Sequence, residues 1–167
     1  MTSLTLVRRI AARPSIVFDA LTTAEGIAAW WGPDDGPVLA AQSDVRVGGD
    51  YLVRFRMQDG SEHEARGEYL EMVRPKRVVM SFRWAFGGAP EEIGNISRVE
   101  MELRAIGDET ELTFTHANLV AASIPSASKP SHEQGWSVAL DKLVLCLTGV
   151  DSQWIAASAG NEKASGT

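Results

Sequence analysis

Residues 78–84 read Val-Val-Met-Ser-Phe-Arg-Trp, and the side chains at the even-numbered positions are all large and apolar. Side chains alternate between the two faces of a β-strand, so this period of two predicts a strand with one covered face and one wetter face. The same period recurs along residues 38–116, interrupted by turn residues of which Asp59-Gly60 is the strongest hairpin signal. Consecutive strands joined by such short turns predict an antiparallel meander.

Two short helices are predicted between a first strand at residues 3–10 and this meander. Pro14 suits the first turn of a helix, because its missing N–H would have no partner there. Residues 22–25 (Thr-Thr-Ala-Glu) form a capping-box pattern, which predicts the start of a second helix carrying Trp30 and Trp31.

A long amphipathic helix is predicted after the sheet, starting at a second capping-box pattern in residues 131–134. Its apolar stripe recurs at spacings of four, three and four residues, at Trp136, Leu140, Leu143 and Leu147. This stripe must cover the apolar sheet face, so the predicted fold is α+β, a helix-grip with a curved antiparallel sheet wrapped around the C-terminal helix. A curved sheet leaves a gap against a straight helix, and such apolar gaps are the usual form of a small-molecule site.

Length and composition favour one ordinary domain. The chain has 167 residues, and we expect a single domain over residues 1–156 followed by a flexible tail over residues 157–167. The formal net charge of -6 at pH 7 argues against a nucleic-acid partner, because duplex-binding proteins present a basic face. The N-terminus lacks a signal-peptide pattern, and the apolar stretch at residues 143–147 is too short for a membrane span. With Cys146 as the single cysteine, these features predict a cytoplasmic protein without a membrane partner.

The inward faces of the strands and helices supply the expected lining of the cavity. His116 ends an apolar strand stripe and should face inward, where a histidine can hydrogen-bond a ligand or act as an acid or base near neutral pH. The alternative is a structural histidine bonded to its neighbours. The candidate ligand-binding residues are Trp30, Trp31, Phe55, Tyr69, Phe82, Trp84, Met101, Phe114, His116, Trp136 and Leu140.

No pattern in the sequence indicates a metal site, a cofactor or a catalytic nucleophile. The three histidines have no paired spacing, whereas zinc ligands come at close, recurring intervals. We expect His63 to be exposed beside the hairpin turn and His132 to have a local capping role. Cys146 falls in an apolar helix segment and is interpreted as a core residue, and no nucleotide-binding fingerprint occurs.

Five motifs, in order over residues 5–150, together resemble a known family. They are Trp30-Trp31-Gly32-Pro33 after a Thr-x-x-Glu helix start, Gly48-Gly49-x-Tyr51, Gly67-x-Tyr69, Leu112-Thr113-Phe114-Thr115-His116, and His132-x-x-Gly135-Trp136-x-x-x-Leu140-x-x-Leu143. The chain is similar to the domain homologous to the C-terminal half of the activator of the Hsp90 ATPase, within the START/Bet v 1-like (SRPBCC) superfamily. This resemblance implies a helix-grip fold and often a hydrophobic cavity.

The resemblance leaves the function open, because a fold does not select an activity. The superfamily includes lipid carriers, hormone receptors and polyketide cyclases. The eukaryotic co-chaperone has an additional N-terminal domain that contributes to Hsp90 binding, and this chain has no room for it. We therefore do not expect Hsp90 as a partner.

Three functions remain as hypotheses. The preferred one is non-catalytic binding of a small apolar or amphipathic molecule, because the inner face is rich in aromatic residues and poor in ionisable groups. The second is a cyclase-like or hydrolase-like enzyme that uses His116 with a cavity tyrosine. The third is a protein-binding module or co-chaperone, and a homodimer is also compatible with the sequence. A protein-binding module would need an apolar or charged outer patch, whereas the outward residues resemble an ordinary solvated face: Arg54, Arg56, Glu100, Glu102 and Arg104.

Overall fold

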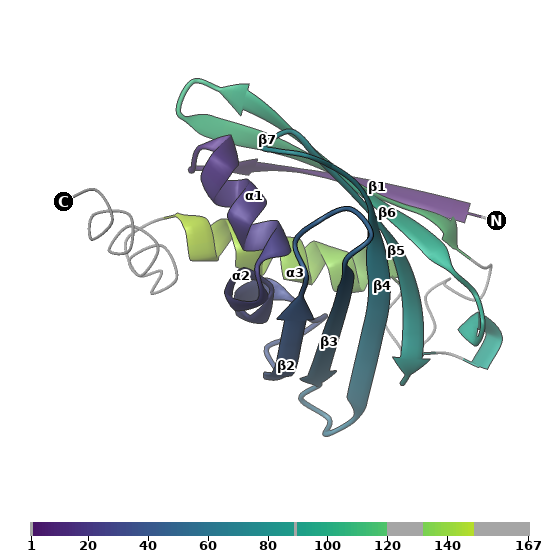
Figure 1. The fold of residues 1–167 in the computed structure, drawn as a ribbon. Helices are drawn as coiled ribbons and strands as arrows, with labels where there is room; N and C mark the ends of the chain where they lie inside the picture. Colours follow the sequence, from purple (N-terminus) through teal and green to yellow (C-terminus); the bar gives the residue numbers. More distant parts are fainter. Residues whose placement is uncertain (1, 89, 120–131, 149–167) are drawn as a thin grey trace.

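A computed structural model describes residues 2–88, 90–119 and 132–148 (Figure 1). Within these residues the strands form one antiparallel sheet in the order β1-β7-β6-β5-β4-β3-β2. The strands are β1 (Thr2–Ile10), β2 (Val38–Ser43), β3 (Asp50–Arg56), β4 (Glu62–Val73), β5 (Arg77–Phe86), β6 (Ser97–Ile106) and β7 (Glu109–Leu119). The helices are α1 (Pro14–Thr22), α2 (Ala24–Trp30) and α3 (His132–Leu147), with a 3-10 turn η1 (Pro90–Glu92) between β5 and β6.

The sheet curves around α3, which lies across its concave side (Figure 1). β1 pairs with β7, so the first and last strands of the chain are neighbours and β2 to β7 form the predicted meander. α1 and α2 lie at one end of the concave side and η1 lies toward the other (Figure 1). The predicted helix-grip fold is therefore confirmed.

Burial follows the predicted alternation in β3, whereas in β5 Val79, predicted to lie on the wetter face, is fully buried. In β3 the side chains of Tyr51, Val53 and Phe55 are buried, while Arg54 and Arg56 between and after them are exposed. The stripe of α3 is also buried as predicted. Burying large apolar side chains of this kind contributes about 1.5–3 kcal/mol each, which is the main force that closes the sheet onto the helix.

The cap of α2 falls one residue later than the sequence pattern predicts. Thr22 is the last residue of α1, and its hydroxyl donates to the carbonyl oxygen of Phe18 at 2.8 Å. Thr23 is therefore the N-cap, and its Oγ1 accepts a hydrogen bond from the backbone N–H of Gly26 at 3.1 Å. Either of the two adjacent threonines could cap α2, and Thr23 does so because Thr22 still belongs to α1.

The pairing of β4 with β5 is irregular at two points, between Glu64 and Ala65 and between Tyr69 and Glu71. Val73 is exposed although Tyr69, four residues earlier, is buried, because the second register shift reverses the alternation. A Cβ atom at Gly67 would lie 1.9 Å from the carbonyl oxygen of Ser81 on β5, so only glycine permits the close approach of these strands.

Some expectations fall on residues outside the described part of the chain. These are the tail at residues 157–167, the domain end at residue 156 and Ser131 of the expected capping box. Within the described residues, no helix is long and apolar enough to cross a membrane.

Candidate functional site

An aromatic cluster occupies the concave side where α2, α3 and β5 meet. Trp31, directly after α2, has its ring centroid 5.0 Å from that of Trp136 on α3 and 5.5 Å from that of Trp30. It also lies nearly parallel to Phe82 of β5, with centroids 6.4 Å apart and planes inclined by 16°. Such ring pairs contribute about 0.5–1.5 kcal/mol each beyond their burial. Elements far apart in the sequence thus contribute to one continuous group of packed aromatic rings.

His116 of β7 is fully buried beside this cluster, and both of its ring nitrogens have partners. Trp136 Nε1 donates to Nδ1 at 2.9 Å, and because an indole N–H can only donate, Nδ1 carries no proton. Nε2 then donates to Ser97 Oγ at 2.7 Å, and that hydroxyl donates to the carbonyl oxygen of Phe82 at 3.2 Å. Burial, with a smaller contribution from His132, lowers the pKa of His116 well below its usual value. His116 is thus a neutral histidine that joins α3 to the sheet.

Glu92 of η1 and His132, the first residue of α3, form a hydrogen-bonded pair at the η1 end of the cluster. Their side chains are only 11% and 10% exposed. The ring centroid of His132 lies 5.0 Å from that of His116 and 6.2 Å from that of Trp84. The sequence had indicated a local capping role for His132, and the structure shows that its Nε2 binds a carboxylate 40 residues away in the chain.

His63 of β4 is half-buried, whereas the sequence predicted an exposed side chain. Its ring stacks on Phe55 of β3, with centroids 5.2 Å apart and planes inclined by 12°. Its Nε2 lies 3.0 Å from the Oγ of Ser61, two residues earlier on the same arm of the hairpin. His63 therefore extends the aromatic cluster toward the β3–β4 hairpin.

Trp84, near the end of β5, has a buried indole N–H that finds no hydrogen-bond partner. The half-buried ring lies among other rings, with centroids 5.2 Å from Phe82, 6.2 Å from Phe55 and 6.2 Å from His132. A buried donor without an acceptor costs about 1–3 kcal/mol. Nearly all buried polar groups in native proteins have partners, so this N–H is an exception among the described residues.

Lys142 of α3 holds the segment that follows α2. Its Nζ donates to the carbonyl oxygen of Asp34 at 2.6 Å and to that of Trp31 at 3.4 Å. Partial burial lowers the pKa of Lys142, and the nearby carboxylates of Asp35 and Asp34 oppose this shift. The ammonium thus positions Trp31 against α3.

The structure brings most, but not all, of the predicted ligand-binding residues together. All of the candidates are buried except Trp84. Tyr69 joins the cluster only through Tyr51, whose ring centroid lies 5.7 Å from that of Tyr69 and 6.1 Å from that of Trp31. The Tyr69 hydroxyl lies on the far side, 2.6 Å from Ser43 Oγ and 3.3 Å from the carbonyl oxygen of Thr22. Met101 and Leu140 are fully buried core residues. The cluster and its margin hold Trp30, Trp31, Phe55, Phe82, Trp84, Phe114, His116 and Trp136.

Sequence reasoning missed several polar residues of the site. Ser97 and His132 had usable signals, because Ser97 continues the inward alternation of Val99 and His132 precedes Trp136 by about one helical turn. Lys142 had a weaker one, because it lies three residues after the buried Ala139 and so beside the apolar stripe. Glu92 had no local pattern that would reveal it. No group of three or more potential metal ligands occurs in the part of the chain that the structure describes.

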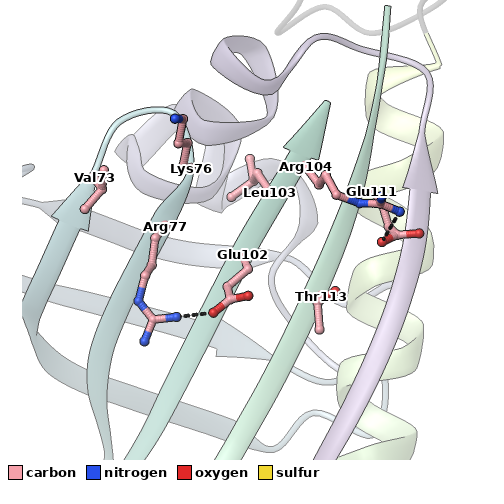
Figure 2. A pocket seen from close by; sticks show the side chains of 8 residues that line it. All are labelled: Val73, Lys76, Arg77, Glu102, Leu103, Arg104, Glu111 and Thr113. Atoms are coloured by element: carbon pink, nitrogen blue, oxygen red, sulfur yellow. Dashed lines mark hydrogen bonds and ion pairs between the residues drawn. The ribbon is translucent and has the colours of Figure 1, made fainter. Parts of the chain in front are cut away.

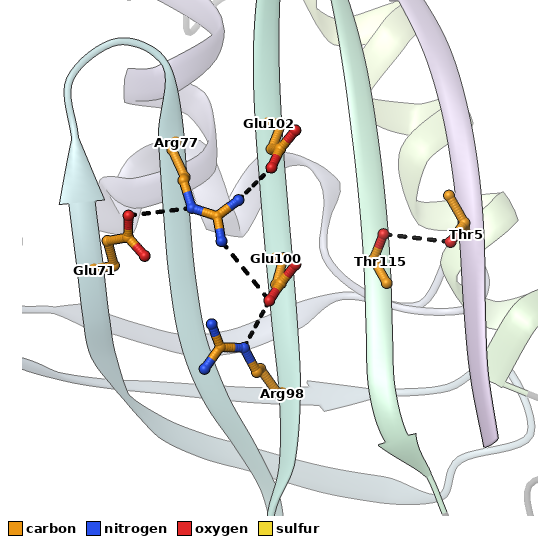
Figure 3. Close-up of polar contacts among 7 residues, drawn as sticks. All are labelled: Thr5, Glu71, Arg77, Arg98, Glu100, Glu102 and Thr115. Atoms are coloured by element: carbon orange, nitrogen blue, oxygen red, sulfur yellow. Dashed lines mark hydrogen bonds and ion pairs between the residues drawn. The ribbon is translucent and has the colours of Figure 1, made fainter. Parts of the chain in front are cut away.

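The outer face of the sheet carries cross-strand ion pairs (Figure 3). Arg77 of β5 contacts Glu71 of β4 at 3.2 Å, Glu100 of β6 at 3.8 Å, and Glu102 of β6. Arg98 pairs with Glu100 at 2.7 Å. Charges on this face therefore neutralise one another.

A hollow of about 430 Å³ opens on the same outer face, at the turn between β4 and β5 (Figure 2). Its charges include the pairs Arg77–Glu102 and Arg104–Glu111. It shares no residue with the predicted ligand-binding set, and its lining consists of Val73, Lys76, Arg77, Glu102, Leu103, Arg104, Glu111 and Thr113.

Comparison with known proteins adds to this geometry. The family model described as Activator of Hsp90 ATPase homolog 1-like protein matches residues 11–148. No curated protein sequence matches the chain. A crystal structure of a protein from Chromobacterium violaceum is similar with a TM-score of 0.75 and 24% identity, over 89% of this chain and 98% of that one.

Two further structures have the same fold. The AHSA1 protein from Silicibacter pomeroyi has a TM-score of 0.71 and 24% identity, over 86% of this chain and 96% of that one. The solution structure of the Aha1 dimer from Colwellia psychrerythraea has a TM-score of 0.63 and 21% identity, over 92% of this chain and 99% of that one. At these identities the likeness establishes the fold.

Proposed function

This chain belongs to the Activator of Hsp90 ATPase homolog 1-like family, and from that premise we propose that it binds a small apolar or amphipathic molecule between the sheet and α3, without catalysis. The observation that carries the proposal is the aromatic cluster around Trp31. Small-molecule sites are mostly apolar and aromatic, with a few placed polar groups. The Glu92–His132 pair and the N–H of Trp84 are polar groups of this kind.

The η1 end of the cluster is the proposed entrance. β5 and β6 pair from Arg77↔Glu102 to Phe82↔Ser97, and β5 then continues beside β4 as far as Phe86. Trp84 lies in this last stretch and is the one half-buried member of the candidate set. A ligand that enters here meets Trp84 first and the rings of Phe82 and Trp31 behind it.

The geometry does not favour an enzyme that depends on His116. Its two nitrogens are engaged by Trp136 and Ser97, so proton exchange with a ligand would require breaking one of these bonds. A general acid or base needs a nitrogen within hydrogen-bond reach of the substrate. The hydrogen-bond chain through Ser97 to Phe82 instead supports a structural role.

The proposal is tested by native mass spectrometry of the freshly purified protein, followed by titration with apolar fluorescent probes. We expect a co-purified small molecule or saturable probe binding. Phe82→Leu should weaken binding, whereas the same change at Phe86, an exposed residue of the same strand, should not. If no molecule co-purifies and no apolar probe saturates the site, the proposed function is wrong.

We also propose that the chain assembles as a homodimer. The Aha1 protein of Colwellia psychrerythraea is a dimer, and this chain exposes large apolar side chains at Ile93, Ile96 and Leu145. Light scattering after size-exclusion chromatography should give twice the chain mass of 18.1 kDa. A monomer mass that does not change with protein concentration would contradict the proposal.

A further inference from the structure

Trp84 differs from its neighbours in the cluster by the state of its indole N–H. Trp30 Nε1 donates to the carbonyl oxygen of Ala20 at 2.8 Å, and Trp136 Nε1 donates to His116 Nδ1 at 2.9 Å. Trp84 Nε1 is also buried, yet it finds no hydrogen-bond partner among the residues that the structure describes. An indole nitrogen cannot accept a hydrogen bond, so only an acceptor supplied by another molecule or by a rearrangement can satisfy it.

The surroundings of Trp84 keep the ring from turning to find an acceptor inside the protein. A Cβ atom at Gly88 would lie 2.3 Å from Trp84 Cδ1, the carbon next to Nε1, so the backbone after β5 lies directly against this edge of the indole. Phe82 contacts the ring in an edge-to-face arrangement, with planes inclined by 84°, and His132 lies nearly parallel to it, at 29°. The indole is therefore held in place from several sides.

Its position coincides with the proposed entrance. Trp84 is two residues beyond Phe82, where the β5–β6 ladder ends. The rings of Phe82 and His132 border it there, so the unpartnered side-chain donor lies at the end of the β5–β6 pairing and beside the cluster.

Resting on the proposed function, we propose that Trp84 Nε1 recognises a neutral hydrogen-bond acceptor on the ligand, a carbonyl, ester or ether oxygen carried by an otherwise apolar body. The rings of Phe82, Phe55 and His132 hold the apolar part. A carboxylate is disfavoured because the carboxyl group of Glu92 already lies in this cluster, hydrogen-bonded to His132. A pure hydrocarbon leaves the donor unsatisfied.

The test uses two probes with the same apolar body, naphthalene and 2-acetylnaphthalene. The protein should bind the ketone about fivefold to tenfold more tightly, the factor that one net hydrogen bond supplies. Trp84→Phe keeps an aromatic ring and removes the N–H, so it should abolish this preference and leave the affinity for naphthalene within about twofold. Trp31→Phe is the matched control, and it should alter binding of both probes in parallel.

A spectroscopic measurement on the unaltered protein covers the case in which Trp84→Phe does not fold. The Trp84 indole resonance in a ¹H–¹⁵N spectrum should move downfield on addition of the ketone and stay in place with naphthalene. Equal affinity for both probes without this shift overturns the inference and leaves the proposed function standing. Failure of both probes to bind would instead count against the proposed function itself.

Discussion

The indole Nε1 of Trp136 on α3 donates a hydrogen bond to Nδ1 of His116 on β7, over 2.9 Å. This bond connects the helix to β7, the neighbour of the edge strand β1, and sets the tautomer of the histidine. Through Ser97 Oγ the same chain of hydrogen bonds reaches the carbonyl oxygen of Phe82. These buried polar side chains therefore form a network in which each group has a hydrogen-bond partner. The indole N–H of Trp84, by contrast, has none among the described residues.

Trp136→Phe should destabilise the protein. It removes the donor and leaves His116 Nδ1 buried without a partner, which costs about 1–3 kcal/mol. Urea denaturation monitored by circular dichroism measures the change in the free energy of unfolding. Trp84→Phe is the matched control, because it removes an N–H that makes no bond, and its cost should be clearly smaller. Equal losses in the two variants would show that ring volume, and not the hydrogen bond, is responsible.

Stability should fall with acidification below about pH 6.5, the usual pKa of histidine. Burial lowers the pKa of His116 in the folded protein, so between that lowered value and about 6.5 the unfolded chain binds the extra proton. Stability is therefore complete above about pH 6.5 and is lost as pH falls. His116→Gln should flatten this dependence in urea titrations between about pH 5 and 7. Parallel curves for the two proteins would contradict the prediction.

Glu64→Gln should be more costly than Glu62→Gln. Glu64 is 2% exposed and binds Arg54 and Arg66, whereas Glu62 is 45% exposed and contacts only Arg56 at 3.5 Å among the described ion pairs. Loss of the buried carboxylate should cost about 1–3 kcal/mol, and loss of the exposed one less than about 0.5 kcal/mol. Thermal or urea unfolding of both variants measures the two losses in the free energy of unfolding.

Glu64 also has a predictable pH dependence. Burial alone would raise the pKa of Glu64, but the hydrogen bonds from Arg66 and Arg54 prevail and hold it below its usual value. Its contribution to stability is therefore present above about pH 4.5 and is lost as pH falls through the lowered pKa. Glu64→Gln should remove this part of the dependence of stability on pH. The same loss of stability at low pH in the variant would contradict the prediction.

Lys142→Met should loosen the segment that follows α2. The change removes the hydrogen bonds to the carbonyl oxygens of Asp34 and Trp31, at a cost of about 1–3 kcal/mol. Because Trp31 is central to the cluster, apolar probes should also bind more weakly. Lys76→Met, at an exposed position, is the control. A fall in stability without any loss of probe affinity would show that Lys142 does not position Trp31 for binding.

Local patterns in the sequence were enough to predict the strands and the buried face of α3. The alternation at residues 78–84 places Val78, Met80 and Phe82 in the core because successive side chains of a strand point to opposite faces. Turn chemistry located the hairpin at Gly60, whose φ of 89° favours glycine. The same reasoning failed at Val73, because a β-bulge breaks the alternation without any local signal.

What the sequence determined by itself is thus the order of the elements, the faces they bury and, through five motifs, the family. The tertiary structure alone decided how the polar groups are paired. His132 meets Glu92 from 40 residues away, and Lys142 reaches Asp34 from 108 residues away. Periodicity is a property of neighbouring residues, whereas the pairing of buried polar groups depends on how distant elements and their rotamers meet. For that reason the unpartnered Trp84 emerges only when the sheet closes around α3.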